Sequence, residues 1–507
     1  MNNHRSKRCK VNIACETCRM KKSKCDGSQP CFLCHQALTR CVYRCQERPQ
    51  QVSRVRHITE AANTLNALVD WVKGILTVGN RQTPIRHFTS TKSLLEWSSI
   101  KALLQHALDP AFAQESEIAS ARMQSIFCPA RIETEQIETA RELYFKNCHP
   151  FHPFVSRSRK PIPWFPDKQS FATADVTLQT QQMLIAAIGA STTSPVNGLY
   201  HFALSNIGYI IASSSIESVE VFLLLALVYS KECRTIPAWR YITMASSALC
   251  VHVDSIIRGT MWRTHLGERV CRLSWVTLIL EGRILAEFNF PATALSQYED
   301  ILPLPFSTQV DEGENLGEEY HYYFLTHISI RRLLNRTQSS IYADEGRFNQ
   351  VRLELELLSQ LQELELYFPS KLSGILLAHA QMLLVAAKYV ICRPSVYRIM
   401  HFPESILPDD TTRCIMCFKA ICESPVASRD DLDYNILPLP FLMVQATFGK
   451  IMVLLAANYM PHMRQYLPTN WMLGLKRMRN LVVHFTATSS TIRKDLEIID
   501  EAIMKAM

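Results

Sequence analysis

Along most of the chain, apolar residues recur every three or four positions, the period of a helix with one buried face. One such stripe consists of Trp262, Leu266, Val270, Leu273, Leu280, Ile284 and Phe288. The segment VRLELEL at residues 351–357 alternates like a strand, but its Leu and Glu content and the leucines after it favour a helix. We therefore predict a mainly all-α protein whose body comprises a helical middle domain (136–400) and a C-terminal helical region (401–507).

The apolar segments of this body are too short or too interrupted to indicate a membrane protein. The longest wholly apolar run, residues 221–228, is far below the ~20 residues that a membrane-spanning helix needs. Residues 375–392 form a longer apolar stretch, but it contains His379, Gln381 and Lys388 and is more typical of a buried helix. No apolar signal segment follows the N-terminus. We expect a reduced intracellular location and no membrane partner.

A different pattern precedes residue 136. Residues 49–57 lack any apolar period and are predicted to be a linker after an N-terminal domain at 1–48. In the next segment, residues 58–77, apolar residues fill the a and d positions of three heptads: Ile58, Ala61, Leu65, Leu68, Val72 and Ile75. This pattern predicts a short coiled coil that dimerises, or an amphipathic helix that packs on its own body. Residues 78–135 are interpreted as a connector.

Charge is concentrated at the N-terminus. Residues 1–54 contain twelve lysines and arginines but three acidic residues, a balance of +9, whereas the whole chain of 507 residues carries +8. The remainder therefore sums to −1. A small basic domain on a neutral body is typical of an anion-binding module, and nucleic acid is the commonest such partner. Glycine is scarce, with 15 residues, and no phosphate-binding glycine motif occurs, which argues against a nucleotide-dependent enzyme.

Cysteine is concentrated in the same region, where the unit Cys-x2-Cys-x6-Cys occurs twice with a period of sixteen residues. The six cysteines are Cys15, Cys18, Cys25, Cys31, Cys34 and Cys41. Structural zinc takes four ligands, so one ion leaves two thiolates unused, whereas two ions need eight ligand positions. Six sulfurs fill these positions if two of them bridge. The spacing therefore predicts two structural zinc ions, and a reducing compartment disfavours the alternative of disulfides.

The segment CETCRMKKSKCDGSQPCFLCHQALTRC resembles the fungal binuclear zinc cluster transcription factors in every spacing. The resemblance implies that Cys15 and Cys31 bridge the two ions. It also implies a nuclear regulator of RNA polymerase II transcription that binds double-stranded DNA, forms a homodimer just after the linker and works with the transcription machinery. An activator is favoured over a repressor, and control of a biosynthetic gene cluster is one role that the family offers.

The two halves of the repeat differ in charge. Arg19, Lys21, Lys22 and Lys24 lie between the second and third cysteines of the first half, whereas the second half has one basic residue there, Arg40. We expect the first half to face DNA. The resemblance implies that Lys21 and Lys22 read a CGG triplet while Arg19 and Lys24 contact phosphates. A solvated run of charges is the alternative.

Parts of the body resemble the regulatory middle homology region that follows the zinc cluster in the same family. The segments are residues 144–155, 237–254, 272–291 and the LPLP at 302–305. No enzyme motif competes with this interpretation. His149 and His152 in HPFHP fit a turn better than a metal pair, and Cys414, Cys417 and Cys422 fit a helix core. We predict a protein that is not an enzyme. The alternative function is a helical ligand sensor or scaffold whose zinc cluster mediates protein contacts.

Overall fold

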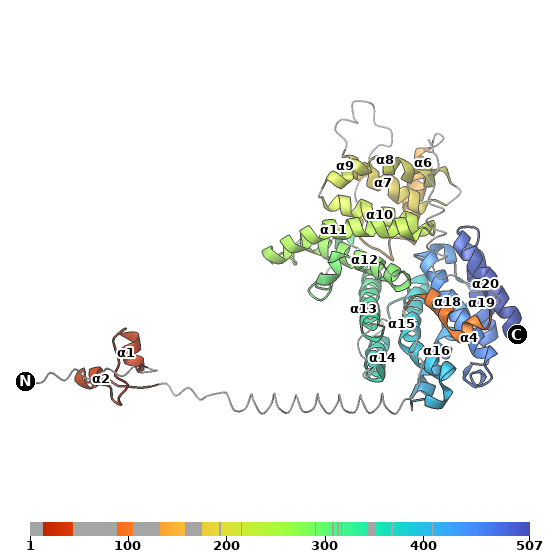
Figure 1. Cartoon of the computed structure of the whole chain (residues 1–507). Coiled ribbons are helices and arrows are strands. Elements are labelled where there is room, and N and C mark those ends of the chain that lie inside the picture. Colours follow the sequence, from red (N-terminus) through yellow and green to blue (C-terminus); the bar gives the residue numbers. More distant parts are fainter. Residues whose placement is uncertain are drawn as a thin grey trace, which may run out of the picture. The chain divides into compact units, whose positions relative to one another are not determined.

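The computed structural model describes residues 14–43, 89–104, 132–157, 175–191, 194–213, 215–288, 290–306, 309–311, 314–315, 317–342, 350–366, 370–407 and 409–507. The chain divides into two compact units, residues 1–84 and 85–507 (Figure 1). In the first unit, the described residues form two short helices, α1 (Glu16–Met20) and α2 (Phe32–Gln36). The six predicted coiled-coil residues between 58 and 77 lie outside the described part of the chain.

The second unit is helical, as predicted. Its longer helices are α6 (Thr134–Asn147), α7 (Val176–Gly189), α10 (Ile216–Lys231), α11 (Thr235–Gly259), α12 (His265–Glu287), α13 (Glu318–Ile341), α14 (Gln350–Leu366), α15 (Gly374–His401), α16 (Asp410–Glu423), α18 (Pro440–Tyr459), α19 (Trp471–Phe485) and α20 (Ser490–Ala506). Short helices connect them: η1 (Thr91–Glu96), α4 (Ser98–Lys101), η2 (Pro195–Gly198), α8 (Leu199–Ser205), α9 (Ile207–Ala212), η3 (Ala294–Tyr298), η5 (Pro403–Ser405), α17 (Pro425–Ser428), η6 (Tyr434–Ile436) and η7 (Arg464–Tyr466).

The alternating segment 351–357 is helical and belongs to α14, which confirms the prediction from its composition. Part of the acidic segment at 311–319 belongs to a small antiparallel hairpin of β1 (Gln309–Asp311) and β2 (Glu314–Asn315). These strands are too short to leave a period-two signal in the sequence.

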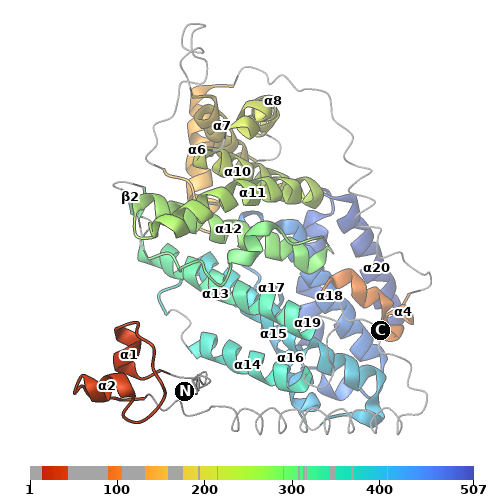
Figure 2. The ribbon, with the colours of Figure 1, turned by 60° about the vertical axis from the view of Figure 1, so that its left-hand side comes forward.

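The helices of the body pack in succession (Figure 2). At one end α7 lies between α6 and α10, and α10 packs on α11. The long helix α12 follows α11 and leads to α13, which contacts α14 and α15. The other end contains α16 and the group of α18, α19 and α20. One continuous apolar core runs through these helices, because each presents apolar side chains to its neighbours.

Two of these helices, α15 and α18, are long and apolar enough to cross a membrane by length and composition. In α18, 94% of the most apolar window is buried inside the body, and in α15 the share is 56%. The apolar surface of α18 is therefore used almost entirely in packing against other helices of the same chain.

A buried ionic network joins α14, α15 and α16. Arg398 donates to both carboxylate oxygens of Glu354 at 3.0 and 2.9 Å, and Arg413 donates to Asp410 at 2.9 Å. Glu354 and Asp410 are fully buried, and Arg413 is 2% exposed. Arg398 also contacts Asp410, so two carboxylates face two guanidinium groups. The balance of charge makes burial of all four groups tolerable.

Residues 89–104, hereafter the tether, fold against the body although the sequence assigns them to a connector. The Glu287 carboxylate accepts hydrogen bonds from Thr91 N and Oγ1 at 2.8 and 2.9 Å. Lys92 pairs with the buried Asp495 of α20, and Trp97 packs against Tyr397 of α15 with ring centroids 4.9 Å apart. The tether thus contacts three helices that are distant in sequence, which local periodicity cannot predict.

Candidate metal centre and nucleic-acid interface

The sixteen-residue repeat of the first unit is also a repeat of structure. Cys15 and Cys31 are the N-caps of α1 and α2. Four backbone hydrogen bonds within the first half have counterparts sixteen residues on, such as Ser23 N to Cys18 O and Thr39 N to Cys34 O, both 3.0 Å. The equivalent residues Lys22 and Leu38 take left-handed backbone angles, with φ of 48° and 49°. The two halves therefore share one backbone conformation.

The repeat brings the six predicted cysteines into one cluster. Their sulfurs form two groups of four, and within each group all sulfurs lie within 4.8 Å of one another. One group is Cys15, Cys18, Cys25 and Cys31, and the other is Cys15, Cys31, Cys34 and Cys41. Both groups contain Cys15 and Cys31, whose sulfurs are 3.7 Å apart. Six sulfurs thus present two sites with four sulfurs each, which is the donor set that structural zinc uses.

The electrostatics of the cluster favour cations. The Cys18 N–H donates to Cys15 Sγ at 3.4 Å and lowers the pKa of the Cys15 thiol to about 6. Burial acts in the opposite direction on Cys18 and raises its pKa to about 11. Closely spaced sulfurs cannot all become anionic in the absence of positive charge. Divalent ions among them remove this conflict and keep every sulfur as a thiolate.

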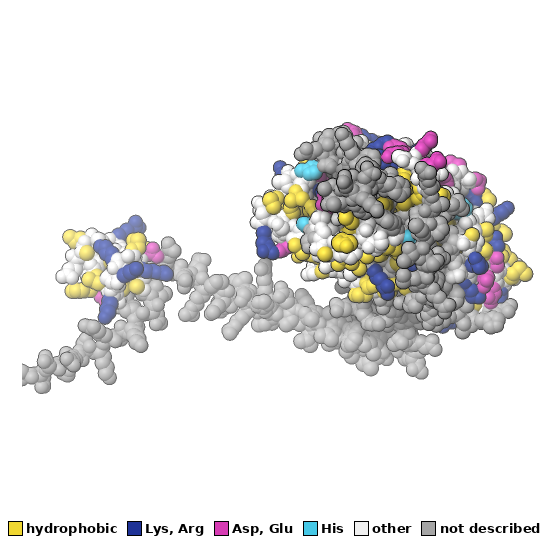
Figure 3. All heavy atoms as spheres, turned by 90° about the horizontal axis from the view of Figure 1, so that it is seen from above, with side chains coloured by type: hydrophobic (Ala, Val, Ile, Leu, Met, Phe, Trp, Pro, Cys, Tyr) yellow, Lys and Arg dark blue, Asp and Glu magenta, His cyan; other side chains and the backbone are white. Residues whose placement is uncertain are grey.

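The four predicted DNA-contacting residues, Arg19, Lys21, Lys22 and Lys24, are all exposed. None of them forms an ion pair with another residue in the part of the chain that the structure describes. Lys and Arg side chains are visible as dark blue spheres on the first unit in Figure 3. Their charges are therefore free to meet an anionic partner.

The second half of the repeat presents a different surface. The counterparts of Arg19, Lys21 and Lys22 are His35, Ala37 and Leu38, and only Lys24 has a basic counterpart, Arg40. Leu38 is 95% exposed, and Phe32 of α2 is 66% exposed. One backbone thus displays a basic surface on its first half and a largely apolar one on its second.

Two residues outside the cysteine pattern support the cluster. The Asp26 carboxylate accepts from Phe32 N at 3.0 Å at the start of α2 and from Ser28 Oγ at 2.8 Å, and these bonds lower the pKa of the Asp26 carboxyl group. The Tyr43 hydroxyl donates to Ser28 O at 2.9 Å and lies 3.2 Å from Cys25 Sγ. Asp26 precedes a glycine, a pair that is typical of turns, but no signal in the sequence marks Tyr43.

The remaining candidate residues are buried in the body. His149 and His152 lie in and after the turn that follows α6, and His149 bonds the Val155 carbonyl at 2.8 Å. Cys414 and Cys417 are buried in α16. Among the residues that the structure describes, only the N-terminal cysteines gather into groups with the spacing of metal ligands.

Residues 13–50 match the sequence profile of the fungal Zn(2)-Cys(6) binuclear cluster domain. The chain is also 26% identical over 408 residues to ecdB of Aspergillus rugulosus, whose name gives it a proposed role as a transcription factor. That alignment covers 72% of this chain and 71% of ecdB. No solved structure matches the chain.

The zinc-domain profile and the similarity to ecdB support a DNA-binding regulator of transcription, which here consists of a small zinc domain and a large helical body. Its first unit contains a fungal Zn(2)-Cys(6) binuclear cluster domain, which binds two zinc ions through its six-cysteine cluster. This finding confirms the resemblance drawn from the cysteine spacing.

Proposed function

We propose that this chain is a nuclear activator of RNA polymerase II transcription that binds CGG half-sites as a homodimer. Control of a biosynthetic gene cluster is the pathway that we propose for it. In this proposal, Cys15 and Cys31 bridge the two ions, Cys18 and Cys25 complete the first site, and Cys34 and Cys41 complete the second. Both ions then have four protein ligands and no open position for water, so zinc is structural and the protein is not an enzyme.

One observation carries the proposal. The zinc domain has two halves with the same backbone, and only the first half displays a set of exposed cations without ionic partners. Lys21 and Lys22 follow directly after α1, where ammonium groups can reach the O6 and N7 acceptors of guanine in the major groove. Arg19 and Lys24 flank them and are proposed to contact phosphates.

The repeat supplies a matched variant to test base recognition. Lys22→Leu installs the residue found at the equivalent position 38, which takes the same left-handed backbone angle. We expect the zinc-loaded full chain with Lys22→Leu to bind a CGG duplex about 1–3 kcal/mol more weakly in fluorescence anisotropy, with little change on a scrambled duplex. Equal losses on both duplexes would mean that Lys22 does not read bases.

The dependence of DNA binding on salt concentration tests the proposed contacts with phosphate. Arg19→Ala should weaken binding to all duplexes alike and reduce the slope of log K against log [salt] by about 0.9. Arg40→Ala, on the second half, is the control and should leave the slope unchanged. If chelation of zinc does not abolish binding, or if no duplex is preferred, the zinc cluster serves protein contacts and the scaffold hypothesis takes precedence.

We further propose that the homodimer forms through residues 58–77, on the strength of the heptad pattern. Leu65→Lys places a charge at a central a position of that pattern. We expect this variant to sediment as a monomer and to lose preference for paired over single CGG triplets. A variant that remains dimeric would assign the segment to packing on the body.

A further inference from the structure

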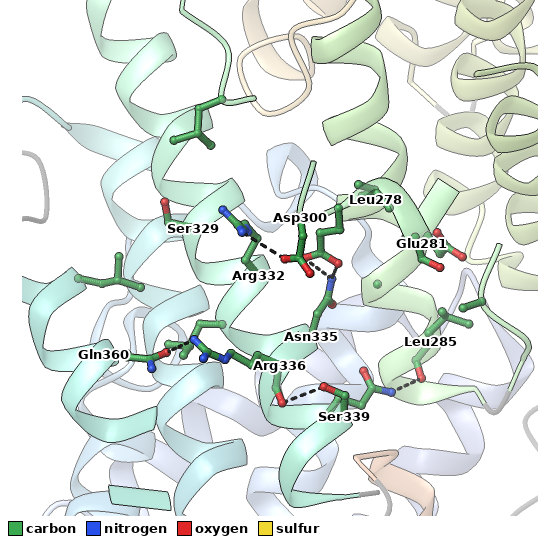
Figure 4. Close-up of a pocket in the computed structure, with 18 of the residues that line it drawn as sticks. Leu278, Glu281, Leu285, Asp300, Ser329, Arg332, Asn335, Arg336, Ser339 and Gln360 are labelled. Atoms are coloured by element: carbon green, nitrogen blue, oxygen red, sulfur yellow. Dashed lines mark hydrogen bonds and ion pairs between the residues drawn. The ribbon is translucent and has the colours of Figure 1, made fainter. Parts of the chain in front are cut away.

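The body contains a pocket of about 1080 Å³ that the function proposed above does not use (Figure 4). It lies between the C-terminal half of α12, the segment that includes η3, and helices α13 and α14. Small-molecule sites have volumes of about 300–1,000 Å³, so this pocket is large enough for an organic molecule.

One wall of the pocket is apolar. Leu278, Leu285 and Phe288 of the α12 side line it together with Leu333 of α13. Phe288 stacks on Phe290, another lining residue, with ring centroids 5.3 Å apart and an interplanar angle of 11°. Contact with this wall removes hydrocarbon surface from water, so the wall favours a ligand with an apolar body.

The charged side chains of the pocket leave an excess of carboxylates. Four carboxylates line it, from Glu281, Glu299, Asp300 and Glu363, against two guanidinium groups, from Arg332 and Arg336, a formal balance of −2. Arg332 turns towards Asp300, and Arg336 bonds Gln360 at 3.1 Å (Figure 4). Among the residues that line the pocket, carboxylates therefore outnumber cations.

Two of these carboxylates, Glu281 and Glu299, are less exposed than Asp300, and they differ in how many hydrogen bonds they already accept. Glu281 is 2% exposed, and its two oxygens accept hydrogen bonds from Thr293, one from N and one from Oγ1. Each oxygen therefore already has its own donor within the chain. Glu299 is half-buried, and both of its oxygens share a single amide group, Asn335 Nδ2, at 3.2 and 3.1 Å. No cation in the described chain lies within ion-pair distance of Glu299. Burial raises the pKa of the Glu299 carboxyl group, although the Asn335 hydrogen bond and the charges of Arg331 and Arg332, which lie beyond ion-pair distance, act in the opposite direction.

We propose that this pocket binds an organic cation, in which an ammonium group pairs with Glu299 and an aliphatic or aromatic body lies against the apolar wall. The ligand supplies the positive charge that the pocket lacks and covers the apolar wall. Neither the zinc cluster nor the DNA-facing residues take part in this site.

Octylamine, octanoate and octanol test this inference because they share one hydrocarbon chain and differ in charge. Each is titrated into the zinc-loaded full chain by isothermal calorimetry at pH 7, below the concentration at which it aggregates. We expect saturable binding of octylamine, at least tenfold tighter than that of octanoate. Equal binding of the two would show that the pocket does not select a cation and would overturn the proposal.

Three variants test whether octylamine binds in this pocket. Glu299→Gln keeps the shape and the Asn335 contact and should weaken octylamine binding about tenfold. Ser329→Trp fills the pocket and should abolish binding of all three probes. Glu404→Gln removes an exposed carboxylate outside the pocket and should have no effect. Octylamine binding that survives both pocket variants would place the amine elsewhere. DNA binding is measured in parallel, so that a failure of the pocket proposal and a failure of the proposed function can be told apart.

Discussion

Replacement of His152 by leucine should stabilise the body or leave its stability unchanged, although His152 is a core residue. The side chain is 2% exposed, and neither ring nitrogen has a hydrogen-bond partner in the described chain. Burial, assisted by the charge of Arg283, lowers its pKa to about 3. The His327 ring lies near it, with ring centroids 6.3 Å apart. A buried polar group without a partner costs about 1–3 kcal/mol, which leucine avoids.

The same replacement should change the dependence of stability on pH. An unfolded histidine has a pKa of about 6.5, and the folded His152 stays neutral down to about pH 3. Since the folded pKa is lowered, only the unfolded chain takes up a proton at this residue as the pH falls below about 6.5. Protonation of the unfolded chain then lowers the free energy of unfolding. Between pH 7 and 5.5 the loss is about 1.3 kcal/mol. His152→Leu should therefore gain about 1.3 kcal/mol on the wild type over this interval.

Urea unfolding followed by tryptophan fluorescence measures this difference. None of the seven tryptophans lies in the zinc domain, and six of them lie in the body, so the signal reports mainly the body. The seventh, Trp71, lies in the predicted coiled-coil segment and is replaced by phenylalanine in both proteins. Burial raises the pKa of Glu287 to about 7, which shifts the pH dependence in the opposite direction, but both proteins share Glu287 and its effect cancels. A leucine variant that is less stable at pH 7 and keeps the wild-type pH dependence would show that the folded imidazole has a hydrogen-bond partner. That result would refute the prediction.

Three further predictions concern the zinc domain and the packing of the body. Cys31→Ser should reduce the zinc content measured by mass spectrometry and abolish DNA binding without changing the urea midpoint of the body. Gly189→Ala places a Cβ 1.8 Å from a backbone carbonyl oxygen of α6 and should cost about 1–3 kcal/mol in urea unfolding, whereas Gly208→Ala meets open space and should not destabilise. Glu354→Ala leaves Arg413 without one of its buried carboxylates and should cost about 3–5 kcal/mol by the same assay; a smaller loss would show that water enters the network.

The sequence was most informative where structure depends on the spacing of residues that are close together in the chain. Ligand spacing depends on residues close in the chain, so the cysteine repeat predicted one cluster with two groups of four sulfurs. Helical periodicity predicted the body for the same reason. Tyr43 could not be found, because a tyrosine just outside a motif has no spacing rule, and its contact with Cys25 depends on the folded turn.

Features that depend on distant contacts were not predictable. The tether carries a short helical pattern of apolar residues, but nothing in that pattern names its partners Glu287 and Asp495, which lie far along the chain. The pocket likewise depends on the approach of α12 and α13, which Gly282 permits: a Cβ there would lie 2.8 Å from Asn335 Oδ1. Neither Glu299 nor Gly282 stands out in the linear sequence.

The tether also constrains the order of events while the chain is being made. Lys92 and its partner Asp495 are 403 residues apart. At about 5–20 residues per second, a ribosome needs about 20–80 s to deliver the partner. The last of the six cysteines, at position 41, is made early, so the zinc domain can complete its cluster while the tether still exposes Trp97 and its leucines. During that interval the nascent chain presents a substrate for chaperones, and a chain that ends before α20 never buries Lys92 against its carboxylate.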